Sequence, residues 1–107
     1  MRLYRLAADQ GDEVAIYNIG YCYSHGEGAE QDYDEAYKYY VQAAEADLPI
    51  AMFSLRECYY LGNGVEQNVE EAANWYRKSL EAGYEPDETD REHLKEVLGE
   101  EWKETDS

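Results

Sequence analysis

Apolar residues recur along the chain at the three- and four-residue spacing of one helical face, and the same pattern returns thirty-six positions later. The two faces consist of Ala15, Ile19, Cys22 and Tyr23, and of Ala51, Leu55, Cys58 and Tyr59. Each stretch is followed by a Gly-x-Gly, at 26–28 and at 62–64, whose glycines tolerate the positive φ of a helix C-terminus. The pattern therefore predicts two amphipathic helices that each end in a tight turn.

A second helix is predicted after each Gly-x-Gly. Asp32 with Glu35, and Asn68 with Glu71, have the spacing of a capping box, in which a short polar side chain starts the helix and a carboxylate follows three residues later. The packed faces of these helices are Ala36, Tyr39, Tyr40, Ala43 and Ala44, and Ala72, Trp75, Tyr76, Ser79 and Leu80. Each unit is thus predicted to be a helical hairpin.

The two hairpins are copies of one unit, because residues 15–50 align on residues 51–86 without a gap and with twelve identities. Residues 1–14 match the second helix of a unit in the same register. Repetition at this period predicts an all-α fold, an α/α superhelix of about two and a half repeats, in which each unit covers an apolar face of its neighbour.

Residues 87–107 break the pattern, and we expect them to form an acidic capping helix with a frayed end. The apolar stripe of this helix is Leu94, Val97, Leu98 and Trp102. The simplest interpretation is that the stripe seats the cap on the last hairpin. The alternative is that it joins two copies of the chain in a weak homodimer.

The unit resembles the Sel-one-like repeat, a relative of the tetratricopeptide repeat. The resemblance rests on the period, on both Gly-x-Gly turns and on the aromatic pairs Tyr39-Tyr40 and Trp75-Tyr76, and it covers about Leu3 to Gly83. It implies a right-handed superhelix that acts as an adaptor for protein–protein contacts and has no catalytic activity.

Two positions depart from the family pattern. Gly20 stands where the family keeps a small residue, but the second copy has Arg56, which is expected to extend toward solvent or to push its hairpin open. Asp47 replaces the glycine that normally ends the second helix, so Gly83 has no glycine counterpart in the first copy.

In repeats of this kind the first helix of each unit lines the concave side of the superhelix. The residues that this predicts for partner binding are Val14, Tyr17, Tyr21, Ser24, His25, Ile50, Phe53, Glu57, Tyr60 and Leu61. Aromatic anchors with one or two charges suit a helix or an extended peptide. For Tyr17 and Phe53 packing in the core is favoured over contact with a partner, whereas for Tyr21 and Tyr60 both interpretations stay open.

The charge balance narrows the class of partner. Nine Lys and Arg against 25 Asp and Glu give a net charge of −16, which disfavours binding to nucleic acid and to anionic membranes. Most acidic surpluses are solvated surface. The alternative function is an acidic decoy or inhibitor that holds a basic or nucleic-acid-binding protein through its field, and that binding would weaken steeply with salt.

Other chemistry finds little support in the sequence. Cys22 and His25 lie one turn apart, but the second copy has Leu61 in place of the histidine and further metal ligands are not evident. The acidic run at 32–35 fits helix capping better than a calcium loop, and the glycines at 26–28 follow a helix rather than a strand. We therefore expect no cofactor, no metal and no enzymatic activity.

The two cysteines and the start of the chain bear on where in the cell the protein is located. Cys22 and Cys58 are expected to be reduced and buried, and the first ten residues lack the apolar core of a signal peptide. A cytoplasmic location is favoured for the chain as written, although its place in the cell does not follow from the sequence.

Overall fold

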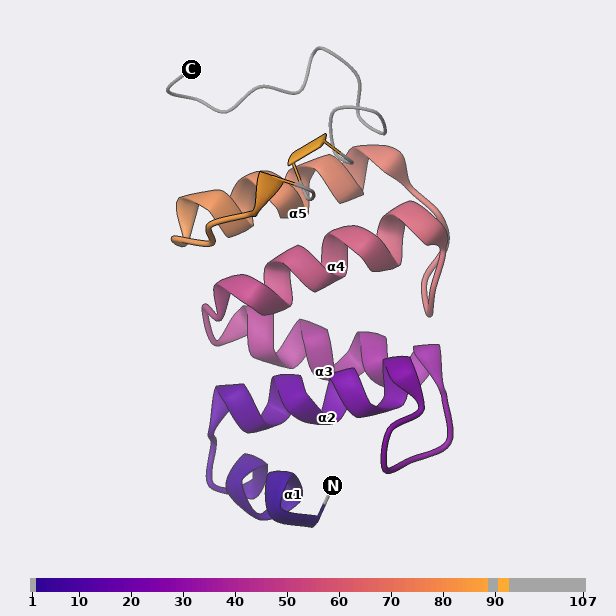
Figure 1. Cartoon of the computed structure of the whole chain (residues 1–107), viewed down its shortest axis with the longest axis vertical. Helices are drawn as coiled ribbons and strands as arrows, with labels where there is room; N and C mark the ends of the chain where they lie inside the picture. The colour runs from indigo at the N-terminus through magenta and orange to yellow at the C-terminus, as the bar shows by residue number, and fades with distance from the viewer. Residues whose placement is uncertain (1, 89–90, 93–107) are drawn as a thin grey trace.

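The computed structural model describes residues 2–88 and 91–92, and those residues form five α-helices (Figure 1). The helices are α1 (Arg2–Asp9), α2 (Glu13–His25), α3 (Tyr33–Glu45), α4 (Pro49–Leu61) and α5 (Val69–Glu81). Each packs chiefly against the helices before and after it in the chain, so the molecule is a short stack of 42 × 24 × 21 Å. The predicted all-α solenoid is confirmed. The stripe at Leu94, Val97, Leu98 and Trp102 lies outside the described residues.

The helix starts follow the predicted capping chemistry. Asp32 accepts a hydrogen bond from the Glu35 amide at 3.2 Å, and Asn68 accepts the equivalent bond from Glu71 at 3.1 Å. Asp12 does the same for α2, through the amides of Val14 and Ala15. In contrast α4 begins with Pro49 in its first turn, where the missing N–H removes no helical bond.

The structure of the helix ends explains why both repeats have a glutamine shortly after the Gly-x-Gly. Gly26 and Gly62 end α2 and α4 with φ of 68° and 74°. The side-chain amides of Gln31 and Gln67 then reach back to the carbonyls of Ser24 and Tyr60, at 2.9 and 2.8 Å. A helix leaves its last carbonyls without helical donors, so each glutamine satisfies one of them and holds the turn closed.

The main core lies between the two repeats rather than inside either one. It joins α3 to α4 through Ala36, Tyr40, Ala43, Ala44, Ala51, Met52, Leu55 and Cys58. Four of the eight are alanines, which let the two helices approach closely. The hydroxyls of Tyr37 and Tyr59 meet at 2.8 Å at the edge of this contact.

Arg56 corrects the expectation for the second hairpin, because its side chain neither reaches solvent nor forces α4 and α5 apart. The residue is 6% exposed, and its guanidinium carbon lies 4.3 Å from the centre of the Phe53 ring. In the first repeat a Cβ at Gly20 would come within 2.9 Å of the Tyr40 ring. The second repeat tolerates a long side chain at the equivalent position because the guanidinium of Arg56 lies against the ring of Phe53, one helical turn earlier.

Asp47 forms, in the first repeat, the turn that Gly83 forms in the second. Its φ is 65°, in the left-handed region, and Gly83 stands at the equivalent place with φ of 105°. The same two backbone bonds close both turns: Asp47 and Leu48 donate to Ala44 and Ala43, as Gly83 and Tyr84 donate to Leu80 and Ser79. The first repeat therefore has the same turn, formed by an aspartate that adopts the left-handed backbone conformation less readily than glycine does.

Among the described residues, none of the helices has both the length and the apolar character that crossing a membrane requires.

Replacing Gly64 with alanine is expected to lower the free energy of unfolding by about 3 kcal/mol or more. Gly64 has a φ of 77°, and a Cβ there would overlap the backbone carbonyl of Tyr33 in the preceding repeat. Gly62 has a similar φ of 74°, but its Cβ would be in ordinary contact with Gln67, no nearer than 3.4 Å. The matched Gly62→Ala variant should therefore lose only about 1 kcal/mol. Urea denaturation followed by circular dichroism measures both, and equal losses would contradict the account.

Replacing Asp47 with glycine is expected to stabilise the protein by about 1 kcal/mol, because glycine accepts the left-handed backbone and a negative charge leaves the C-terminus of α3. Asp47→Asn removes the charge but keeps a side chain, so it should give roughly half the gain. Thermal unfolding of the two variants beside the wild type separates the contributions. A loss of stability in Asp47→Gly would show that the aspartate makes a compensating interaction.

Candidate binding groove

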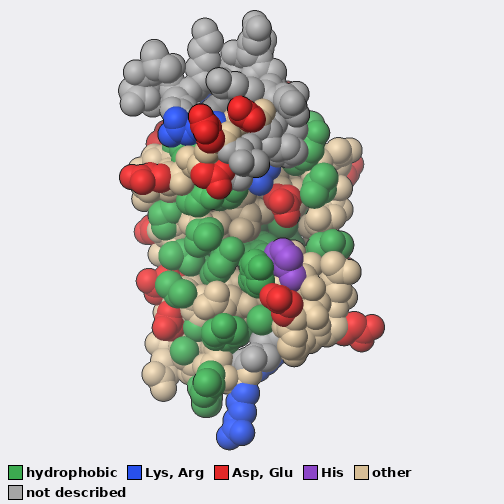
Figure 2. Space-filling view, in the orientation of Figure 1, with side chains coloured by type: hydrophobic (Ala, Val, Ile, Leu, Met, Phe, Trp, Pro, Cys, Tyr) green, Lys and Arg blue, Asp and Glu red, His purple; other side chains and the backbone are tan. Residues whose placement is uncertain are grey.

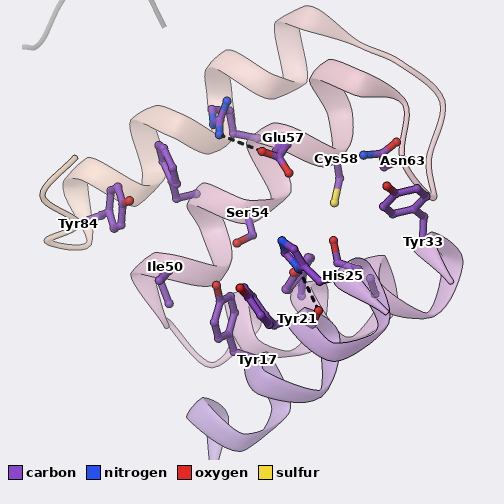
Figure 3. Close-up of a pocket in the computed structure, with 15 residues that line it drawn as sticks. Tyr17, Tyr21, His25, Tyr33, Ile50, Ser54, Glu57, Cys58, Asn63 and Tyr84 are labelled. Atoms are coloured by element: carbon purple, nitrogen blue, oxygen red, sulfur yellow. Dashed lines mark hydrogen bonds and ion pairs between the residues drawn. The ribbon is translucent and has the colours of Figure 1, made fainter. Parts of the chain in front are cut away.

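A groove of about 250 Å³ lies between α2 and α4, the first helices of the two repeats (Figure 3). Ala36 and Tyr40 of α3 contribute to its floor. Its walls are Tyr17, Tyr21, Ser24 and His25 from α2, and Ile50, Phe53, Ser54, Arg56, Glu57 and Cys58 from α4, with Tyr33, Asn63 and Tyr84 at its ends. Figure 2 shows hydrophobic side chains gathered down the middle of one face of the molecule.

The α2 wall is aromatic. The Tyr17 ring lies 5.5 Å from the Tyr40 ring and 6.5 Å from the Tyr21 ring, centre to centre. Tyr21 in turn stacks on the His25 ring at 4.0 Å, and the His25 Nδ1 lies 3.1 Å from the Tyr21 carbonyl oxygen. These contacts fix a row of rings in place, although Tyr21 keeps 39% of its surface exposed.

The α4 wall is mixed. Phe53 is packed in the core as favoured, with the Tyr84 ring stacked on it at 4.3 Å and the Tyr76 ring tilted at 5.7 Å. Ile50 is 40% exposed at one end of the wall. The Glu57 carboxylate lies further along, and Figure 3 shows it across the groove from Tyr21 and His25. Tyr21 and Glu57 are thirty-six residues apart, so equivalent positions of the two repeats present a phenol and an acid.

Most of the predicted residues meet in this groove, but not all. Tyr17, Tyr21, Ser24, His25, Ile50, Phe53 and Glu57 line it. Val14 and Leu61, which are 50% and 55% exposed, do not line it, and neither does Tyr60. Tyr60 and Leu61 are the equivalents of Ser24 and His25, so a groove at their position would need a further hairpin beyond α5.

The lining also includes residues that sequence reasoning did not name for binding, which are Tyr33, Ala36, Tyr40, Ser54, Arg56, Cys58, Asn63 and Tyr84. For Ser54 a signal was present, because it lies four residues after Ile50 and three before Glu57 and so shares their helical face. Tyr33, Asn63 and Tyr84 lie at helix ends and in connections, where periodicity gives no direction for a side chain. Only the packing of the repeats brings them to the groove.

Burial keeps three titratable groups that line the groove neutral. It raises the pKa of Tyr17 and Tyr40, and it raises the pKa of the Cys58 thiol to about 12. The negative charge of Glu57 adds to all three pKa shifts. The Glu57 side chain is 53% exposed and that of Arg56 is 7% exposed, so Glu57 offers the more accessible charge.

Within the described part of the chain, no three His, Cys, Asp or Glu side chains gather closely enough to hold a metal ion. Cys22 is buried and does not line the groove, so the Cys22 and His25 pair does not converge on a shared site there.

The stacked hairpins form an α-solenoid with a groove between the first helices of the two repeats. The Sel1 repeat model matches residues 1–12, 14–48 and 49–84, and the chain belongs to the Sel1 repeat family. Proteins of this family are generally protein–protein interaction modules, and their fold is typically a non-catalytic scaffold.

Two solved structures resemble this chain closely. The crystal structure of a Sel1 repeat protein from Oxalobacter formigenes has a TM-score of 0.73 and 35% identity, over 77% of this chain and 34% of that one. The structure of c5321, a protective antigen of uropathogenic Escherichia coli strains that displays an SLR fold, has a TM-score of 0.73 and 41% identity, over 76% of this chain and 17% of that one. The chain thus spans about a third or less of these proteins. The search of the curated proteins gave no match.

The Cys58 thiol is expected to resist modification in the folded protein. A pKa of about 12 in place of 9.0 lowers the thiolate fraction at pH 8 about a thousandfold, and the thiolate is the nucleophile. In a Cys22→Ala variant, whose only thiol is Cys58, a disulfide reagent should react slowly at pH 8 and rapidly after denaturation. Because burial favours the neutral thiol, its contribution to stability is present below pH 9 and is lost as the pH rises toward 12. Rapid modification of the native variant would contradict the burial.

Proposed function

We propose that this chain is a non-catalytic interaction module that binds a segment of a protein partner in the groove between α2 and α4. The observation that carries the proposal is an open hollow with exposed apolar side chains on both walls, Tyr21 from one repeat and Ile50 from the next. Exposed aromatic and aliphatic groups around a recess are typical of anchor sites for a partner side chain.

The fixed rings favour binding for a second reason. Contacts with neighbouring aromatic groups already hold Tyr17 and Tyr21, so a partner would lose little of its binding free energy in ordering them. Catalysis is disfavoured by the same geometry, because the Cys58 thiol stays protonated and the His25 Nδ1 already contacts the Tyr21 carbonyl.

The alternative function is an acidic decoy for a basic or nucleic-acid-binding protein. It is favoured by the net charge of −16. In that case the whole surface would attract the partner, binding would weaken by orders of magnitude with added salt, and the groove residues would matter no more than any others.

The Tyr21→Ser variant tests the groove directly, and Tyr4→Ser is its matched control. Both tyrosines are 39% exposed, but Tyr4 lies on α1 and does not line the groove. A partner captured by the immobilised wild type should, once purified, bind Tyr21→Ser at least about tenfold more weakly, as loss of an aromatic anchor predicts. Its affinity for Tyr4→Ser should be unchanged.

Titration calorimetry at low and high salt completes the test. Groove binding predicts that the preference of the partner for Tyr4→Ser over Tyr21→Ser persists at high salt. Equal affinities for the two variants, together with release of the partner by salt, would overturn the groove and support the decoy.

A further inference from the structure

We propose that the groove accepts an arginine side chain of the partner, held between the tyrosine rings of α2 and the Glu57 carboxylate of α4. The inference rests on the proposed function and names the chemistry that the groove recognises. Its volume of about 250 Å³ is small for a drug-sized molecule, whose pockets begin at about 300 Å³, and suits one long side chain.

The aromatic wall provides the first half of the recognition. Tyr21, which is 39% exposed, and the half-buried Tyr17 bring two rings to the groove with centres 6.5 Å apart, and the buried Tyr40 ring supports Tyr17 at 5.5 Å. The face of an aromatic ring carries partial negative charge and attracts a cation that lies within about 6 Å of its centre. Arginine uses such a surface well because its guanidinium is planar and weakly hydrated.

Glu57 provides the second half. Its carboxylate lines the groove with 53% of the side chain exposed, and its contact with Arg56 is long, at 3.9 Å between Oε2 and Nη2. A carboxylate accepts about four hydrogen bonds, so one distant cation leaves room for the two parallel bonds of a guanidinium. Figure 3 shows the Glu57 carboxylate facing Tyr21 across the groove, so one ligand group can lie between ring and carboxylate.

The charge of the groove selects a cation over an anion. Arg56 is the Lys or Arg residue that lines the groove, but its side chain is only 7% exposed and lies against Phe53. The net charge of −16 repels acidic segments and attracts basic ones before contact. Charge complementarity therefore favours a basic partner segment with one arginine seated in the groove.

The chain itself contains a model of this recognition. Arg56 places its guanidinium 4.3 Å from the centre of the Phe53 ring while its Nη2 lies 3.9 Å from the Glu57 carboxylate. The proposed ligand arginine would make the same two kinds of contact, with the tyrosine rings in place of Phe53 and with the same Glu57 carboxylate.

Short capped peptides test the inference without the natural partner. The probes are acetyl-Ala-Arg-Ala-amide and the same peptide with citrulline, which has nearly the shape of arginine but no charge, or with lysine. Titration of the isotope-labelled protein, followed by amide NMR, should give shifts confined to the groove for the arginine peptide, with a dissociation constant in the millimolar range. The citrulline and lysine peptides should bind at least about fivefold more weakly, through loss of the charge and of the planar fork.

Two variants locate the charge that matters. Glu57→Gln keeps the size of the side chain and should weaken the arginine peptide at least about fivefold. Glu45→Gln removes the same charge from an exposed position of α3 that does not line the groove, and it should change binding less than about twofold.

Several results would overturn the inference: shifts spread over the acidic surface, absence of binding, equal affinity for arginine and citrulline or lysine, or equal effects of the two variants. None of these results affects the test of the proposed function with the Tyr21→Ser and Tyr4→Ser variants. A partner that depends on Tyr21 but binds without an arginine would keep the proposed function and remove this inference alone.

Discussion

The close contact of α3 with α4 is the interaction on which the rest of the structure depends. It joins the second helix of one repeat to the first helix of the next, and it contains most of the residues of the main core. Alanines on both helices allow the close approach, and Tyr40, Met52 and Leu55 fill the space around them. Neither hairpin buries these side chains alone, which is the physical reason that the unit is repeated.

The groove is a consequence of that contact. Its walls are first helices from different repeats, and α3 lies between them and contributes to the floor. The separation of Tyr21 from Glu57 is therefore set by how α3 packs on α2 and on α4. A single repeat would present a tyrosine or an acid, whereas the stack presents both on the walls of one groove.

The two departures from the repeat show how packing compensates for an unsuitable residue. Arg56 keeps its charge in the interior because Phe53 and Glu57 lie beside it, so the local cost is offset by an aromatic face and a carboxylate. Asp47 keeps the turn between repeats because the two backbone bonds that close it require only the left-handed φ, which aspartate can reach. In both places the fold is retained and the strain stays local.

The sequence by itself determined the helices and their caps, because these depend on neighbours along the chain. The spacing of Asp32 and Glu35, the glycines at 26 and 62 and the periodic apolar faces specify where helices start and end, and the period specifies a solenoid. It also placed Tyr21 and Glu57 at the groove, since both fall on the side of the first helices that the hairpin core leaves open. Tertiary structure alone decided that Tyr33, Asn63 and Tyr84 join the groove and that Arg56 turns inward onto Phe53. Those outcomes depend on contacts between different helices. The relative positions of the helices are fixed only when the hairpins pack, so no local sequence pattern predicts these contacts.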